Sequence, residues 1–95
     1  MPAYVIVETN VSDPEQYERY KEAAPPTIAA YGGRYVARGG DLAVFEGDWD
    51  PARVVILVFP DLETAKAWYA SEEYGEARKL REGVAQLNVV AVEGL

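Results

Sequence analysis

The sequence predicts a single α+β domain over residues 1–95 of the ferredoxin-like type, an antiparallel βαββαβ sheet that carries its helices on one face. Three observations support this prediction. β-rich and helical segments follow in the order strand, helix, strand, strand, helix, strand, with an extra extended segment after the second strand. The 95 residues suffice for one domain with a modest core. Several strands are apolar on both faces, although the helices can cover only one.

Composition and charge exclude several classes of function. The net charge is −7 and the pI is about 4.5, so neither nucleic acid nor an anionic membrane is expected as the main partner. The chain has no cysteine and no histidine, which removes thiolate chemistry, imidazole metal ligands and a His-ligated haem. No apolar run approaches membrane-spanning length, and no charged-then-apolar leader precedes the first strand. We therefore expect a cytoplasmic protein with no metal and no cofactor.

The first strand and the first helix have clear signals. Residues 3–9 are β-rich and almost continuously apolar, which predicts a central strand. Asp13 and Pro14 predict the start of a helix, because aspartate caps the first turn and proline is tolerated at the first helical position. The prolines at 25–26 cannot donate to the carbonyls four residues earlier, so we expect them to interrupt this helix. A second short helix over residues 27–31 would then continue at an angle.

Two extended segments in the middle of the chain allow two arrangements. Residues 34–38 and 42–46 are both extended, and residues 39–41 (GGD) separate them. One arrangement is a hairpin, which would place Arg34 opposite Glu46. The other is one long strand that a glycine bulge bends.

The second half repeats the pattern of a strand, helices and a strand. Residues 53–59 (RVVILVF) are the clearest strand of the chain. Asp61 and Ser71 predict the starts of two successive helical segments, since each is a good N-cap residue with acidic side chains in the turn that follows. Residues 87–92 predict the last strand.

The strand at residues 54–59 predicts a homodimer formed by sheet faces. Its side chains are apolar at odd and at even positions alike, so both faces of the strand favour burial. Each Val, Leu or Phe left in water would forgo roughly 1.5–3 kcal/mol. A second copy that covers the open face is the simplest solution.

Several motifs together resemble a known family. These are YGGRYVARGG, FEGDW, VVILVFPD after Arg53, AWYASEEY, and finally Arg81 and VEG. The combination is similar to the DUF1330 family of small bacterial proteins. The resemblance implies a dimeric α/β barrel, in which two ferredoxin-like sheets close face to face, and the function of the family is not established. Relatives of this fold include cofactor-free monooxygenases, isomerases and binding modules. Asn88 stands where the family would place an acidic residue, so no carboxylate role is assigned in the last strand.

Six residues form the candidate ligand-binding set: Tyr20, Arg38, Glu46, Trp49, Tyr74 and Arg81. Arginine beside glycine amides can bind an anion, and tyrosine hydroxyls can hydrogen-bond a carbonyl or phenolate oxygen. Each also has a structural alternative: an ion pair with an acidic neighbour for the arginines, a cross-strand pair with Arg34 or Arg53 for Glu46, and core packing for the tyrosines. Trp49 lies in a polar turn, which favours a cleft or a dimer rim. Tyr17, Trp68 and Tyr69 are assigned to the core.

These residues predict one pocket per subunit, between the sheet and the helices, for a small anion or an enolisable carbonyl compound. One hypothesis is a cofactor-independent enzyme on a small carboxylated or phenolic compound, with Arg and Tyr polarising an oxygen. A second is a ligand-binding or sensor dimer without turnover. A third is a purely structural dimer. Without histidine, a general base would have to be a carboxylate such as Glu46 or Glu8, or a tyrosine.

Overall fold

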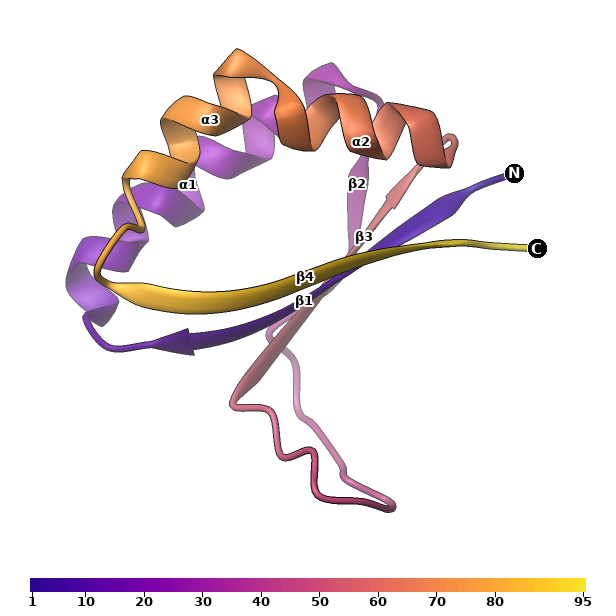
Figure 1. The fold of residues 1–95 in the computed structure, drawn as a ribbon. Coiled ribbons are helices and arrows are strands. Elements are labelled where there is room, and N and C mark those ends of the chain that lie inside the picture. The colour runs from indigo at the N-terminus through magenta and orange to yellow at the C-terminus, as the bar shows by residue number, and fades with distance from the viewer.

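The computed structural model describes all residues, 1–95, as a four-stranded antiparallel sheet with its helices on one face (Figure 1). The strand order β2-β3-β1-β4 puts β1 and β3 inside the sheet and leaves β2 and β4 as its edges. The elements are β1 (Ala3–Val11), α1 (Pro14–Ala30), β2 (Arg34–Arg38), β3 (Arg53–Phe59), α2 (Leu62–Ala70), α3 (Glu72–Lys79) and β4 (Ala85–Glu93). The predicted ferredoxin-like α+β fold is confirmed. None of the helices has the length and apolar character needed to cross a bilayer.

The two faces of the sheet differ because side chains alternate along each strand. On β1, Val5 and Val7 point toward the helices and are buried, whereas Ile6 lies on the opposite, open face. Ile6 pairs with Ile56 of β3 and with Val90 of β4, so a row of apolar side chains crosses the open face. No helix covers this face (Figure 1). The expected two-sided apolar strands are therefore present.

Aromatic side chains fill the space between the helices and the sheet. Trp68 is only 2% exposed and packs on Phe59 and Tyr74, with ring centroids 5.1 and 4.1 Å away. Tyr17 is buried as well, so the core assignment of Tyr17 and Trp68 is confirmed. Tyr69 is 36% exposed, and its assignment to the core is wrong. Successive helical residues are rotated by about 100°, so Trp68 and Tyr69 cannot both point at the sheet.

The first helix is continuous, so the predicted interruption at residues 25–26 is wrong: α1 spans Pro14–Ala30. The prolines still remove two helical hydrogen bonds, one of them to the Lys21 carbonyl. Two features maintain the helix across them. Ala24 and Ile28, on either side of the prolines, are buried in the core, and the Lys21 carbonyl receives a guanidinium donor in place of the missing amide. Tertiary packing has overridden a local breaker signal.

The predicted helix caps are all present. The side chains of Asp13, Asp61 and Ser71 each accept a hydrogen bond from the amide three residues later, at 3.1, 2.7 and 3.1 Å. These bonds satisfy amides that have no partner inside a first turn. Ser71 is also the C-cap of α2, so the chain begins α3 in a new direction immediately.

The segment after β2 departs from both predicted arrangements. Residues 42–46 belong to no strand, and they form neither a hairpin arm nor a bulged continuation of β2. The irregularity in β2 lies earlier, between Tyr35 and Ala37. Gly39, with a φ of 71°, then turns the chain out of the sheet, and a Cβ atom there would lie 2.8 Å from Nε of Arg53. Since no strand lies opposite the following loop, it projects away from the helices (Figure 1).

Candidate functional site

The core encloses a small space between α1 and the sheet, here called the inner cavity. Its volume is about 30 Å³, enough for one or two waters, since one water needs roughly 10–15 Å³. Three of the six candidate residues line it: Tyr20, Arg38 and Tyr74. The rest of the lining is Val7, Thr9, Tyr17, Lys21, Ile28, Tyr35, Arg53, Val55, Leu57 and Trp68.

Two tyrosines from different helices meet at the inner cavity. The hydroxyls of Tyr20 on α1 and Tyr74 on α3 lie 2.6 Å apart, and Tyr74 is buried. The Ser71 cap helps to fix this position, because the Tyr74 amide donates its hydrogen bond to Oγ of Ser71. Burial and the adjacent Tyr74 hydroxyl raise the pKa of Tyr20 far above that of a free tyrosine. Tyr20 therefore remains protonated at neutral pH, where it is a hydrogen-bonding group and not a base.

Arg81 lies beside this tyrosine pair, after the end of α3. Its guanidinium carbon is 5.4 Å from the centre of the Tyr20 ring, and its Nε is buried with no hydrogen-bond partner. Burial disfavours the charge on Arg81, but the hydroxyls of Tyr74 and Tyr20 outweigh this effect and raise the pKa of Arg81. Arg81 forms no ion pair with an acidic neighbour such as Glu73 or Asp50, which was its structural alternative: the three ion pairs of the chain all join a lysine to a glutamate.

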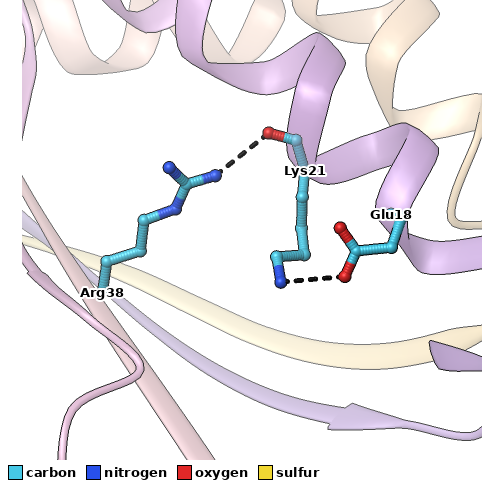
Figure 2. A network of polar contacts seen from close by, with 3 residues as sticks. All are labelled: Glu18, Lys21 and Arg38. Carbon is cyan, nitrogen blue, oxygen red and sulfur yellow. Dashed lines mark hydrogen bonds and ion pairs between the residues drawn. The ribbon is translucent and has the colours of Figure 1, made fainter. Parts of the chain in front are cut away.

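Arg38 lines the inner cavity from β2. The irregularity in β2 makes both Tyr35 and Arg38 pair with helix-facing residues of β3, although a regular strand would put residues three apart on opposite faces. The Arg38 guanidinium lies 4.5 Å from the centre of the Tyr35 ring. Its Nη2 donates to the Lys21 carbonyl at 3.0 Å (Figure 2). That carbonyl is the one that Pro25 leaves without a helical donor, so a proline in α1 positions an arginine of β2.

We expect Pro25→Ala to uncouple Arg38 from α1. Alanine restores an N–H donor to the Lys21 carbonyl. Proline disfavours a helix by ~3 kcal/mol, but it also restricts the unfolded chain, which offsets up to ~1 kcal/mol. The free energy of unfolding should therefore rise by roughly 1–2 kcal/mol. Arg38→Ala should cost about 1 kcal/mol in the natural sequence and much less in the Pro25→Ala background. Urea unfolding of the four proteins measures this coupling. Equal costs of Arg38→Ala in both backgrounds would show that the two residues act independently.

A larger space, here called the outer groove, lies between α2 and β4 on the helical side of the sheet. Its volume is about 450 Å³. It is lined by Val5, Ala65, Lys66, Trp68, Tyr69, Arg81, Leu87, Val89 and Ala91. Lys66 and Arg81 are its only charged residues, and it contains no carboxylate. Trp68 lines both spaces and separates them.

The structure does not bring the other two candidate residues to these spaces. Trp49 is 58% exposed in the projecting loop, and its Nε1 donates to Oε2 of Glu8 at 2.9 Å. Glu8 also accepts from Nδ2 of Asn88 at 3.0 Å, so this cluster lies on the open face of the sheet. Glu46 is exposed in the same loop and forms no ion pair with Arg34 or Arg53.

The outer groove lies between the sheet and the helices, where a pocket was expected, but of its lining residues only Arg81 was among the six candidates. Its apolar wall comes from alternate residues of β4, namely Leu87, Val89 and Ala91. The sequence predicted this strand but not which of its residues would line a pocket. That α2 leaves part of this face uncovered depends on where the helix crosses the sheet. No group of three His, Cys, Asp or Glu residues is placed to hold a metal ion.

Comparison with solved structures shows a shared fold at low sequence identity. RPA0582, a protein of unknown function from Rhodopseudomonas palustris, has a TM-score of 0.77 and 18% identity, with 99% of this chain and 82% of that chain covered. SnoaB, a cofactor-independent oxygenase from Streptomyces nogalater, has a TM-score of 0.70 and 15% identity, with 99% and 93% covered. A dimeric ferredoxin-like protein of unknown function from Thermobifida fusca YX has a TM-score of 0.68 and 20% identity, with 99% and 92% covered.

The sequence itself identifies the family. No curated protein matches the chain. The family model described as a domain of unknown function, DUF1330, matches residues 2–95, which is almost the entire chain. The motifs that predicted this resemblance include the glycines after β2 and the Trp68–Tyr69 pair on α2. The chain belongs to the DUF1330 family.

Proposed function

We propose that this protein is a homodimer that binds one small, flat carboxylated or phenolic compound per subunit in the outer groove, with Arg81 holding the anionic oxygen. The observation that carries the proposal is the guanidinium of Arg81. It faces an apolar groove, has a buried Nε without a partner and is paired with no carboxylate, in a chain with 16 acidic residues and 9 basic ones. A fixed positive charge in such a place favours a ligand oxygen.

The dimensions and lining of the groove support a ligand of this kind. Its volume of about 450 Å³ lies within the range of roughly 300–1,000 Å³ that is usual for small-molecule sites. Trp68 and Tyr69 offer aromatic surface, and the β4 wall is aliphatic. A planar apolar body with one charged oxygen would therefore bury its hydrocarbon surface and keep its charge paired.

The open face of the sheet supports the homodimer. The apolar row through Ile6, Ile56 and Val90 has no cover within the chain, and burying each such side chain contributes roughly 1.5–3 kcal/mol. The protein of similar fold from Thermobifida fusca YX is described as dimeric. Face-to-face stacking of two copies would close both sheets around a shared core.

Binding without general-base catalysis is the function that these groups favour. Neither the outer groove nor the inner cavity is lined by a carboxylate, and Tyr20 stays protonated. A second candidate function is oxygenation of the same ligand by dioxygen, with the electrons supplied by the ligand. It is supported by the fold shared with the cofactor-independent oxygenase SnoaB and by Arg81, which would stabilise a phenolate. Oxygen consumption with a bound phenol would separate the two.

Calorimetric titration with benzoate, 4-hydroxybenzoate and the neutral analogue benzamide tests the proposal. We expect the two anions to bind and the amide to bind much more weakly. Arg81→Gln should weaken anion binding by roughly 10–150-fold, which corresponds to a charged hydrogen bond of about 1.5–3 kcal/mol. Arg19→Gln removes an equal charge from an exposed position on α1 and should change nothing. The proposal fails if the natural protein binds neither anion, or if Arg81→Gln, checked for an unchanged fold, binds them equally well.

A further inference from the structure

The loop between β2 and β3 carries an apolar segment that its own subunit does not cover. Residues 40–46, here called the arm, lie between Gly39 and Gly47, which both have positive φ values of 71° and 92°. The arm exposes Leu42, Val44 and Phe45, and Phe45 is 96% exposed. Exposed apolar side chains gathered in one short segment are typical of a contact with another molecule.

The base of the arm is anchored, so its direction is defined. Trp49 donates to Glu8 on the open face of the sheet, and Glu8 is held in turn by Asn88 of β4. Beyond this anchor the arm projects from the sheet on the side away from the helices (Figure 1). That is the side on which a second copy would stack its own open face.

We propose that the arm of one subunit passes the β4 edge of its partner and closes the partner's outer groove, with Phe45 forming the outer wall of the ligand site. This inference rests on the proposed function, because it completes the same site. Each site would then be incomplete in a monomer: Arg81 and Trp68 come from one subunit, and the apolar lid comes from the other.

The geometry of stacked sheets permits this contact. A two-fold axis parallel to the strands sets the β2 edge of one copy over the β4 edge of the other. Stacked sheets lie about 10 Å apart, whereas the seven residues of the arm can extend over roughly 23 Å. The arm begins two residues after the β2 end, and its returning limb from Phe45 to the anchored Trp49 has four residues, which span at most about 13 Å. Because Trp49 itself lies above the open face, this length lets Phe45 pass the edge of the partner's sheet and reach the rim of the groove behind β4.

The chemistry of the arm and the groove is complementary. The arm is a continuous apolar run over residues 42–45, with Asp41 before it and Glu46 after it, and the groove is apolar with Lys66 and Arg81 as its only charges. Lys66 has a side chain that is 63% exposed at the rim, whereas Nε of Arg81 is buried. Lys66 pairs with Glu63 of its own helix at 3.4 Å, an exposed contact that Glu46 of an incoming arm would join or replace, leaving Arg81 for the ligand. The outer edge of β4 also has unpaired backbone groups at alternate residues, to which the arm can hydrogen-bond where it crosses the edge.

Disulfide trapping tests the contact without any ligand, because the natural chain has no cysteine. Glu46→Cys and Lys66→Cys are made in separate chains with tags of different size, mixed to exchange subunits, and oxidised. We expect a covalent heterodimer as the main new product, and a mixture of Glu46→Cys with Glu76→Cys on α3 should not give one. Absence of the heterodimer with Lys66→Cys overturns the inference. So does an intramolecular disulfide in a chain that carries both changes, since the arm would then close its own groove.

Complementation between two defective variants tests the effect on binding. Phe45→Ala should weaken 4-hydroxybenzoate binding about tenfold while leaving the dimer intact. Mixing Phe45→Ala with Arg81→Gln should restore natural affinity at a quarter of all sites, because each heterodimer combines one intact arm with one intact groove. No restoration, or no effect of Phe45→Ala, refutes the inference and leaves the Arg81 site standing. If the natural protein binds no anion, the proposed function falls while the disulfide result still decides where the arm lies.

Discussion

Trp68→Ala lowers the free energy of unfolding by about 3–5 kcal/mol, the expected cost of removing a fully buried tryptophan. The indole packs between Phe59 of β3 and Tyr74 of α3, so its loss leaves a cavity that neither neighbour can fill alone. Its Nε1 also donates to Oγ1 of Thr27 at 3.1 Å, which joins α2 to α1. Because Trp68 separates the inner cavity from the outer groove, the same change merges the two spaces.

Trp49→Ala is the matched control, since it removes the same side chain from an exposed place. Its single hydrogen bond, to Glu8, is solvent-accessible, and we expect a loss of no more than about 1 kcal/mol. Urea unfolding at one fixed protomer concentration compares the two, because a dimer couples stability to concentration. Similar losses for both variants would mean that Trp49 belongs to the folding core and not to a surface for a partner.

Ile56→Lys disrupts the proposed dimer more than any other single change. The side chain lies in the middle of the open face, between Ile6 and Ala37 on the neighbouring strands. Two-fold symmetry places the change on both subunits, so two apolar contacts of roughly 1.5–3 kcal/mol each are lost and two charges are buried. We expect the dimer dissociation constant to rise by a factor of roughly 10²–10⁴.

Sedimentation velocity over a range of concentrations measures this shift. The subunit should remain folded, because Ile56 points away from the helices and contributes nothing to the core between helices and sheet. Ala67→Lys introduces the same charge on an exposed position of α2 and should leave association unchanged. A natural protein that sediments as a monomer, or an Ile56→Lys dimer of natural affinity, would contradict the sheet-to-sheet arrangement.

The order of elements and the starts of the helices followed from the sequence alone. Asp13, Asp61 and Ser71 cap helices as predicted, because capping depends on one side chain and an amide three residues later. The apolar character of both faces of β3 was equally readable, since strand periodicity is local. The spacing of several short motifs was enough to predict the family.

Other features depended on contacts between distant segments. Pro25 is a local breaker signal, yet α1 continues because the helix is packed on the sheet and Arg38 of β2 replaces the missing donor. The side of the sheet on which Arg38 lies depends on the irregularity in β2 between Tyr35 and Ala37. The glycines at residues 39–40 had suggested a bulge a few residues later in the chain. A strand prediction for residues 42–46 failed because a strand exists only where a neighbour can pair with it.

For the candidate site, too, some features followed from the sequence and others only from the tertiary structure. The sequence by itself determined which residue types were available: six arginines, many tyrosines, and neither histidine nor cysteine. Only the tertiary structure decided that Tyr20 and Tyr74, 54 residues apart, share a hydrogen bond beside Arg81, while Trp49 lies on the opposite face with Glu8. The physical reason is that residue chemistry and local periodicity are properties of the chain, whereas a cavity and its charge are set by how helices cross a sheet.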